Sequence, residues 1–317
     1  MTDAGAAAIE QAELGPVGGT AAATPPIPGV AAGGGWGLVL RSSLRFGRTR
    51  LGLVIVVVIV LVAVVGPFVA PYSPYQFVAA PYAPASSHIV LGADELGRDV
   101  LSRFLHGGYV ILILATLATV LGVGIGTIFG VTAAYRRGAL DELIMRSFDV
   151  LLCFPAVVFA LLLISVLGSK LWLIVVAVAL THAPQVARTM RGAAVQLTGR
   201  EFIGYTEALG IRTWRVVFGE ILPNVTAPLT VELGLRMTWS IGIVASLDFL
   251  GFGRQPPAAD WGLMINENRA GLTIQPWGVV APVIAIALLT IGCSLIADGL
   301  GRAAAGIERE VDTSREP

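Results

Sequence analysis

The sequence predicts an all-α membrane protein with six transmembrane helices. Of its 317 residues, 55% are hydrophobic and only 13% are charged, and the mean hydropathy is +0.79. Soluble domains carry about 25% charged residues, so this composition excludes an ordinary soluble protein. A helix needs about 20 mostly apolar residues to cross the hydrocarbon core. Runs that meet this criterion lie at residues 51–71, 109–134, 148–168, 171–187, 225–250 and 277–298.

The chain begins with a segment rich in Ala, Gly and Pro that shows no helical or strand periodicity. Such a composition buries too little apolar surface to order itself. We therefore expect a disordered tail at residues 1–40, a six-helix transmembrane domain at residues 41–300 and a C-terminal tail at residues 301–317. The first apolar run starts at Leu51 and exceeds the h-region of a secretory signal, so it should remain uncleaved.

The third and fourth runs are separated only by Gly168, Ser169 and Lys170, which predicts a tight helical hairpin. Six spans put both termini on one side of the membrane. The tails and loops on that side carry most of the arginines, namely Arg41, Arg45, Arg48, Arg50, Arg136, Arg137, Arg146, those from Arg188 to Arg215, Arg302 and Arg309. Because positively charged loops stay inside, both termini are expected in the cytoplasm.

Residues 200–224, REFIGYTEALGIRTWRVVFGEILPN, are the most amphipathic segment of the chain. Thr198 and Glu201 have the spacing of a capping box, so a helix is expected to start there and to end at Gly210. A second helix is expected from Thr213, where apolar side chains repeat at helical spacing. These residues alone leave two interpretations open: helices lying on lipid headgroups, or a docking element for a cytoplasmic partner.

A charged loop precedes the second run and lies on the opposite side of the membrane. It contains Asp94, Glu95, Arg98, Asp99 and Arg103 around a glycine. Local ion pairs such as Glu95 with Arg98 are expected to fix the entry of the chain into the second run, so a structural role is favoured.

A second outer loop follows the fifth run and contains Pro256, Pro257 and Trp261. Two prolines and a tryptophan are typical of a rigid connection with an aromatic anchor at the membrane interface. A gate or a docking role is the alternative.

Three ionisable residues fall within the fifth run. Glu232 and Arg236 are four residues apart and can pair on one helix face, and Asp248 lies near the outer end. Because unpaired charges are costly in a membrane, a self-neutralising pair facing the bundle interior is favoured. The alternative is that Glu232, Arg236 and Asp248 line a translocation path and meet the charged termini of a peptide.

The sequence offers no residue pattern for disulfide bonding, metal binding or catalysis. Cys153 and Cys293 lie in apolar runs, which argues against a disulfide framework, and His88, His106 and His182 have no partner at metal-ligand spacing. We expect neither a catalytic site nor a metal site. Acidic and basic residues balance at 21 each, which gives no reason to expect nucleic-acid binding.

Residues 200–224 resemble the cytoplasmic loop of binding-protein-dependent ABC importer permeases, in which a glycine is followed at a fixed distance by Leu-Pro. Gly210, Leu222 and Pro223 match that pattern, and ARTMRG at 187–192 fits it too. The family's Glu-Ala-Ala falls on Gly204, Tyr205 and Thr206, so the acidic residue is missing unless Glu201 or Glu207 replaces it. The resemblance implies a coupling loop at about residues 188–223, with ATPase-coupling residues Glu201, Gly204, Tyr205, Thr206, Glu207, Ala208, Gly210, Leu222 and Pro223.

Two further stretches narrow the resemblance. LGADELGRDVLSRFLHGG at residues 91–108 and DFLGFGRQPPAADWG at residues 248–262 resemble signatures of the C-type permease of dipeptide, oligopeptide, glutathione and nickel importers. The resemblance covers about residues 45–300 and implies a type I importer fold with cytoplasmic coupling helices. It also makes contact with a binding protein an alternative role for the outer residues Asp94, Glu95, Arg98, Asp99 and Trp261.

The chain contains no GxxxxGK[ST] stretch for binding ATP, so the resemblance implies a division of labour. ATP and Mg would be used by two partner ATPase subunits or domains, and this chain would bind no cofactor. It would pair with a second, B-type permease in a bacterial cell membrane and receive solute from an extracytoplasmic solute-binding (lipo)protein. A dipeptide or oligopeptide is expected as solute, with glutathione or a nickel chelate as alternatives.

A stand-alone secondary transporter is the less favoured class, because no internal repeat is evident. The glycines of the second run, Gly122, Gly124, Gly126 and Gly130, fit close helix packing at least as well as broken helices. A membrane-embedded enzyme would need paired catalytic groups at membrane depth, and the sequence shows none.

Overall fold

The residues that the computed structural model of the chain describes, 36–199, 203, 205–206 and 209–306, are mostly helical. They belong to one compact unit, Ala32–Pro317. Apart from two isolated β-bridges, this part of the chain contains no strand. The all-α prediction is therefore confirmed.

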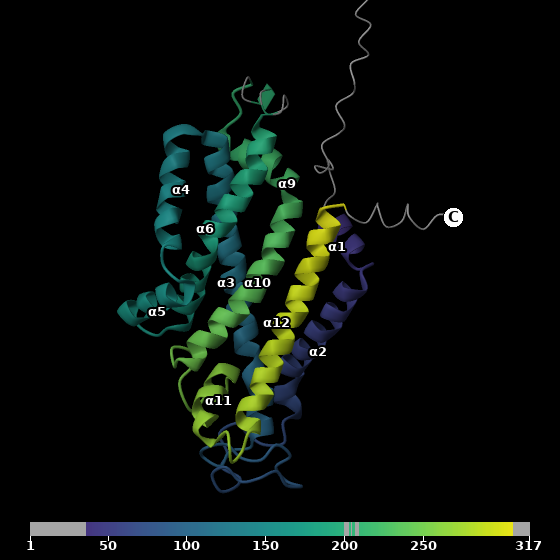
Figure 1. Cartoon of the computed structure of the whole chain (residues 1–317), viewed down its shortest axis with the longest axis vertical. Helices are drawn as coiled ribbons and strands as arrows, with labels where there is room; N and C mark the ends of the chain where they lie inside the picture. Colours follow the sequence, from purple (N-terminus) through teal and green to yellow (C-terminus); the bar gives the residue numbers. More distant parts are fainter. Residues whose placement is uncertain (1–35, 200–202, 204, 207–208, 307–317) are drawn as a thin grey trace, which may run out of the picture. The chain divides into compact units, whose positions relative to one another are not determined.

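The bounds of the helices are α1 Trp36–Ser43, α2 Gly47–Val69, α3 Val100–Arg136, α4 Gly138–Leu152, α5 Ala156–Leu167, α6 Leu171–Thr198, α8 Thr213–Arg215, the π-helix η1 Val216–Ile221, α9 Leu222–Asn224, α10 Thr226–Phe249, α11 Trp261–Asn268, the 3₁₀ turn η2 Arg269–Gly271 and α12 Trp277–Ala304. The connections between consecutive helices range from one residue between α3 and α4 to the long segment 70–99 between α2 and α3 (Figure 1).

Four of the described helices, α2, α3, α6 and α12, are each long and apolar enough to cross a membrane. Two more spans result if each bent helix pair counts as one. The first pair is α4 with α5, bent by 90°, and the second is Thr213–Asn224 with α10, bent by 76°. The described part of the chain thus accommodates up to six spans, as the hydropathy predicts.

The third apolar run differs from a continuous helix because it breaks between α4 and α5. Pro155 is the N-cap residue of α5 and has extended backbone angles. Phe154 precedes this proline, and the residue before a proline avoids the helical region because the ring clashes with it. Hydropathy reports how apolar a run is, not its direction, so it could not show this bend. The expected tight hairpin is present, since α5 ends at Leu167 and α6 starts at Leu171.

Helices α3 and α6 pack closely through glycines one turn apart. Gly122, Gly126 and Gly130 of α3 each face a backbone carbonyl oxygen of α6. A Cβ added at Gly126 would lie 2.6 Å from the oxygen of Ala183, so only glycine permits this approach. The expected role in close packing holds for these three glycines but not for Gly124, which faces open space.

Order begins before residue 41, inside the segment where only a tail was expected. Helix α1 packs against α12, with Val39 and Ser43 buried one turn apart on the same face. At the other terminus α12 continues to Ala304, beyond the expected start of the C-terminal tail. The rest of the two expected tails, residues 1–35 and 307–317, lies outside the described residues.

The bundle has two distinct ends. One end carries α1, the end of α12, the α3–α4 connection and residues 205–206 and 209–215, and we call it the arginine-rich end (Figure 1). The other carries residues 70–99 and α11, and we call it the loop end. Helix α3 connects the two: its 37 residues, at about 1.5 Å each, give a length of about 55 Å.

Candidate functional site

Thr198, the first member of the expected capping box, belongs to the end of α6. Thr198 is the last residue of α6, and its hydroxyl donates to the carbonyl oxygen of Val195 at 3.0 Å and accepts from Arg137 at 2.9 Å. A threonine at a helix end can satisfy the preceding turn as well as cap the next one, so the Thr-x-x-Glu spacing does not by itself fix a helix start. Glu201, the other member of the expected box, lies outside the described residues.

Gly210 ends a helical turn, as the sequence predicts. The amide of Leu209 donates to the carbonyl oxygen of Tyr205 at 3.1 Å, and the amide of Ile211 donates to that of Thr206 at 3.1 Å. Gly210 then adopts a left-handed φ of +67°, which glycine tolerates better than other residues. The described residues Tyr205, Thr206, Leu209, Gly210 and Ile211 are called the coupling tip below.

The expected second helix is continuous from Thr213 to Asn224, but its central turns are wound as the π-helix η1. Val216, Val217 and Ile221 form its buried face. Leu222 and Pro223, which match the family pattern, lie in α9, where the chain bends into α10. The two residues thus occupy the joint between the segment and the fifth span.

An apolar cluster connects this segment to the bundle. Ile203, Val216 and Ile221 are buried together with Val131 of α3 and Leu197 of α6. Because interiors of this kind are closely packed, a displacement of the segment must be transmitted to α3 and α6.

The coupling tip, in contrast, presents apolar side chains that nothing in the described part of the chain covers. Leu209 is 77% exposed and Tyr205 is 69% exposed, and Ile211 is exposed beside them. An exposed apolar group of this kind marks an interaction surface. Gly204, Glu207 and Ala208, which the resemblance also assigns to coupling, lie outside the described residues.

Two ion pairs brace α4 against α6 near the same end, and the sequence reasoning missed both. Arg191 of α6 holds Asp141 of α4 through two bonds of 2.6 Å, and Arg188 contacts Asp149 at 2.5 Å. The two aspartates are eight residues apart, about two helical turns, so they lie on one face of α4. The spacing of the two aspartates, together with the arginines of ARTMRG, was the signal in the sequence for these two ion pairs.

The loop end is held by a buried network of four charges. Asp94 accepts from Arg98 Nε at 2.6 Å and from Arg103 Nη1 at 3.0 Å. Glu267 of α11 accepts from Arg103 Nη2 at 2.7 Å and from Arg98 Nη2 at 3.3 Å. Two carboxylates and two guanidinium groups balance in charge, so the network can be buried. We call it the loop-end latch because it joins residues 94–103 to α11.

The expected pair of Glu95 with Arg98 is wrong, because Arg98 turns inward to Asp94 and Glu267. The amide of Glu95 instead donates to the side-chain oxygen of Asn268 at 3.1 Å, which also connects the loop to α11. Burial raises the pKa of Glu95, and it raises the pKa of Glu267 to about 7 against the opposing effect of Arg98.

Four of the five outer residues considered for contact with a binding protein are buried within the chain. Asp94, Arg98, Asp99 and Trp261 are each at most 1% exposed, whereas Glu95 is partly exposed. Asp99 caps α3 by accepting from the amide of Ser102 at 2.8 Å. A direct contact through these four side chains is therefore corrected to a structural role, because a buried group cannot meet a partner.

Trp261 is not the expected anchor at the membrane interface. Its indole stacks on Phe104 with ring centroids 5.4 Å apart, and its Nε1 donates to the Phe104 carbonyl oxygen at 2.8 Å. Gly107 and Gly108 leave room for the ring, since a Cβ at Gly108 would lie 2.5 Å from it. Trp261 thus packs the start of α11 against α3.

The loop end of α10 carries a buried acid that lies near a second one. Asp248 is 1% exposed, and neither of its carboxyl oxygens has a hydrogen-bond donor among the described residues. Asp260, the N-cap of α11, accepts from the amides of Gly262 and Leu263, and its carboxyl group is close enough to interact with that of Asp248. Two acids can share a hydrogen bond only if one carries a proton. Burial raises the pKa of Asp260 to about 6.

The expected pair of Glu232 and Arg236 is present within α10, at 2.9 Å, and both side chains are largely buried. Arg236 also contacts the side-chain oxygen of Gln185 in α6. This geometry is that of a self-neutralising pair, which ties α10 to α6.

The sequence reasoning missed a short polar chain beside this pair. His182 Nε2 lies 2.9 Å from the hydroxyl of Ser240, and the hydroxyl of Thr119 donates to Ser240 at 2.8 Å. These three hydrogen-bonded side chains connect α6, α10 and α3. Isolated hydroxyl groups in apolar runs are common, so only the folded arrangement reveals it.

Among the described residues, no group of three or more His, Cys, Asp or Glu side chains could hold a metal ion. Cys153, exposed beside the α4–α5 break, and Cys293, buried in α12, are free thiols far apart in sequence. The coupling tip and the buried cluster behind it, which we call the buried root (Ile203, Val216 and Ile221 with Val131 and Leu197), lie at one end of α3. The loop-end latch lies at the other end.

Comparison with known proteins gives two family matches. Residues 122–305 match the family described as binding-protein-dependent transport system inner membrane component. Residues 48–85 match the N-terminal transmembrane domain of oligopeptide transport permease C.

Similar proteins include the glutathione transport system permease protein GsiD of Pectobacterium atrosepticum. It is 35% identical over 262 residues, which cover 81% of this chain and 87% of that protein. The protein of the same name from Escherichia coli is 36% identical over 81% of this chain and 86% of its own length. A solved structure of the MetNI methionine ABC transporter in inward-facing conformations matches 62% of this chain with 19% identity and a TM-score of 0.48.

Proposed function

Because the chain belongs to the binding-protein-dependent transport system inner membrane components, as an ABC importer permease of the peptide and nickel family, we propose that it forms half of a pathway for the ATP-driven import of short peptides. The observation that carries this proposal is the coupling tip, an exposed apolar group at the arginine-rich end. Its root is buried against α3 and α6. A surface of this kind suits a partner that moves the bundle.

The partner at the tip is an ATPase. Two ATPase subunits or domains bind and hydrolyse ATP with Mg, because this chain lacks a phosphate-binding GxxxxGK[ST] stretch. Leu209 and Tyr205 enter an apolar groove of the ATPase, and Gly210 sets the turn that presents them. Gly204 stands where relatives in the resemblance carry an acid, so docking here relies on apolar contact more than on charge.

The arginine-rich end lies in the cytoplasm of a bacterial cell and the loop end lies outside its membrane. The arginines at the α3–α4 connection and between residues 188 and 215 support this orientation, since such loops stay inside. A second, B-type permease completes the pathway, and an extracytoplasmic solute-binding protein delivers the solute to the loop end.

Coupling follows from the packing. Closure of the ATPases on ATP pulls the coupling tip, and the buried root passes this displacement to α3 and α6, which glycine packing holds together. Since ATP can bias the equilibrium only by binding one state better, the ATP-bound ATPases must prefer the tip position of the outward-facing state. The loop-end latch keeps the outer end of α3 fixed to α11 during this movement.

The solute is a short peptide, and glutathione is the second candidate because the similar permeases named above transport it. Glutathione is itself a tripeptide, so both candidates share a carboxylate-bearing peptide backbone. A nickel chelate is the third member of the class.

The test is solute uptake by the whole complex in proteoliposomes. The complex of both permeases and the ATPases is reconstituted with its binding protein, and uptake of a labelled dipeptide, a pentapeptide and glutathione is measured with and without ATP. We expect uptake of at least one of them that needs both ATP and the binding protein. Uptake that ignores ATP, or none for any peptide while a nickel chelate enters, would overturn the proposed solute class.

A further inference from the structure

A groove at the arginine-rich end lies beside the coupling segment and is not explained by coupling. It has a volume of about 570 Å³ and lies between the last turn of α3, the first turn of α4 and residues 212–218. Thr132, Arg136, Leu140, Arg212, Thr213, Trp214, Val217 and Phe218 line it. No acidic residue is among them.

The two arginines of the groove are free of acidic partners within the described part of the chain. Three other arginines at this end are paired: Arg146 with Glu142, Arg188 with Asp149 and Arg191 with Asp141. Arg136 and Arg212 are exposed and make no such bond. The groove therefore has a positive rim that the described part of the chain leaves uncompensated.

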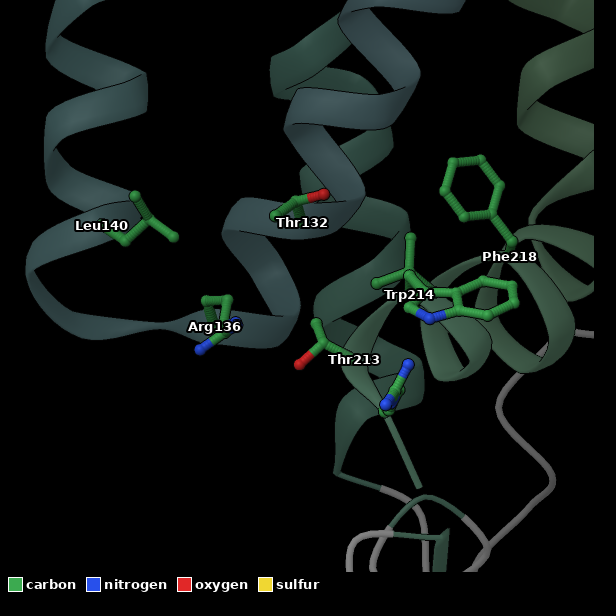
Figure 2. A pocket seen from close by; sticks show the side chains of 8 residues that line it. Thr132, Arg136, Leu140, Thr213, Trp214 and Phe218 are labelled. Atoms are coloured by element: carbon green, nitrogen blue, oxygen red, sulfur yellow. The ribbon is translucent and has the colours of Figure 1, made fainter. Parts of the chain in front are cut away.

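Apart from Thr132 and Thr213, the remaining lining is apolar. Figure 2 shows Arg136 at the end of α3, with Thr132, Leu140 and Phe218 further toward the middle of the helices. Leu140, Trp214 and Phe218 are exposed large hydrophobic side chains, and Val217 lies buried behind them. Arg215 stacks over the Trp214 ring at 5.3 Å, which adds a third positive charge near the rim.

Hydropathy places the groove near the level of lipid headgroups. The apolar run of α3 ends at residue 134, two residues before Arg136, so this arginine lies at the expected boundary of the hydrocarbon core. A tryptophan at this level is typical of the membrane interface. Basic pockets between spans at the membrane surface bind anionic headgroups.

We infer that the groove binds one anionic phospholipid, with the phosphate between Arg136 and Arg212 and the first acyl carbons against Leu140 and Phe218. The charge and the apolar wall together favour this occupant: a free phosphate would leave the wall uncovered, and a zwitterionic lipid would bring its own cation to the arginines. The lipid would thereby support the π-helix η1, which lies between the coupling tip and α10.

The test is lipid retention by the purified complex, measured by native mass spectrometry after exchange into detergent with phosphatidylglycerol or phosphatidylcholine. The test variant is Arg136→Gln/Arg212→Gln, and the matched control is Arg302→Gln, an exposed arginine at the same end outside the groove. We expect the wild type and the control to retain one phosphatidylglycerol that phosphatidylcholine does not replace. The double variant should bind it roughly thirtyfold more weakly, the scale expected for losing two basic contacts with anionic lipid.

Three results would overturn the inference. Equal retention by the double variant would place the lipid elsewhere, and equal loss in the Arg302→Gln control would indicate general surface attraction. Displacement of the lipid by millimolar inorganic phosphate would identify a free-anion site instead. All three readouts concern lipid alone, so they are independent of the transported solute.

Discussion

Asp248 of α10 and Asp260 of α11 bring two buried carboxyl groups close enough to interact, and burial disfavours a negative charge on both of them. Neither carboxylate of the pair has an arginine bonded to it among the described residues, in contrast to Asp94 and Glu267 nearby. The loop end of α10 thus meets α11 through two buried acids, and their interaction depends on pH.

The first prediction concerns this dependence. Burial raises the pKa of Asp260 from 3.8 to about 6, so its protonated form is favoured in the folded state. The resulting stabilisation is complete below a pH of about 4 and is lost as the pH rises through about 6, and a shift of this size corresponds to about 3 kcal/mol. The Tm of the detergent-purified complex should therefore fall over this range more steeply in the wild type than in Asp260→Asn, which keeps the N-cap oxygen. Parallel Tm profiles for the two proteins would contradict the raised pKa of Asp260.

The loop-end latch predicts a large effect of one arginine. Arg103→Gln leaves Asp94 and Glu267 buried with a single guanidinium, and breaking a buried pair costs about 3 to 5 kcal/mol. Arg103→Lys should not restore stability, because an ammonium group cannot bind both carboxylates as the fork does. Arg146→Gln serves as the control, since its pair with Glu142 is exposed and contributes at most about 1 kcal/mol. Equal Tm values for Arg103→Gln and Arg146→Gln would show that the latch does not hold the loop end.

Glycine packing between α3 and α6 predicts a contrast between two neighbouring positions. Gly126→Ala forces a methyl group against the Ala183 carbonyl oxygen, and overpacking of this kind costs about 1 to 3 kcal/mol. Gly124→Ala faces open space, so it should leave stability unchanged or raise it by up to about 1 kcal/mol. Thermal unfolding of the two variants side by side checks this contrast. A Gly124→Ala variant as unstable as Gly126→Ala would indicate a general helix effect.

Membrane orientation predicts opposite labelling of two exposed positions. After Cys153→Ser and Cys293→Ala remove the native thiols, Val90→Cys at the loop end should react with a membrane-impermeant maleimide in intact cells. Tyr205→Cys at the coupling tip should react only after the membrane is opened. Labelling of Tyr205→Cys in intact cells would reverse the proposed orientation.

The positions of the spans could be predicted because hydropathy depends only on local sequence. The end of a helical turn at Gly210 was predictable for the same reason, since a glycine signals a left-handed turn by itself. The break at Pro155 shows the limit, because a run of apolar residues looks the same whether it is straight or bent by 90°.

The contacts that hold the loop end could not be predicted because they join residues distant in sequence. Glu267 is 169 residues from Arg98 and 164 from Arg103, whereas the expected partner, Glu95, was chosen because it was near. Asp248 and Asp260 lie on either side of a loop whose path decides whether they meet. Thr198 lies at the end of α6, where its hydroxyl bonds to the preceding turn, and Glu201 lies outside the described residues.

The central claim is that the coupling tip transmits ATP binding to the bundle, and the ATPase rate of the reconstituted complex tests it most directly. Leu209→Asp places a charge in the exposed apolar tip without disturbing the buried root. Leu96→Asp makes the same change at a position that is 48% exposed at the loop end. With peptide-loaded binding protein present, we expect the stimulated rate of Leu209→Asp to fall at least about tenfold, which is the effect expected for a central interface residue. Leu96→Asp is the control, because it leaves the ATPase interface intact. If Leu209→Asp assembles with the ATPases and is stimulated as fully as the wild type, the tip is not the coupling element.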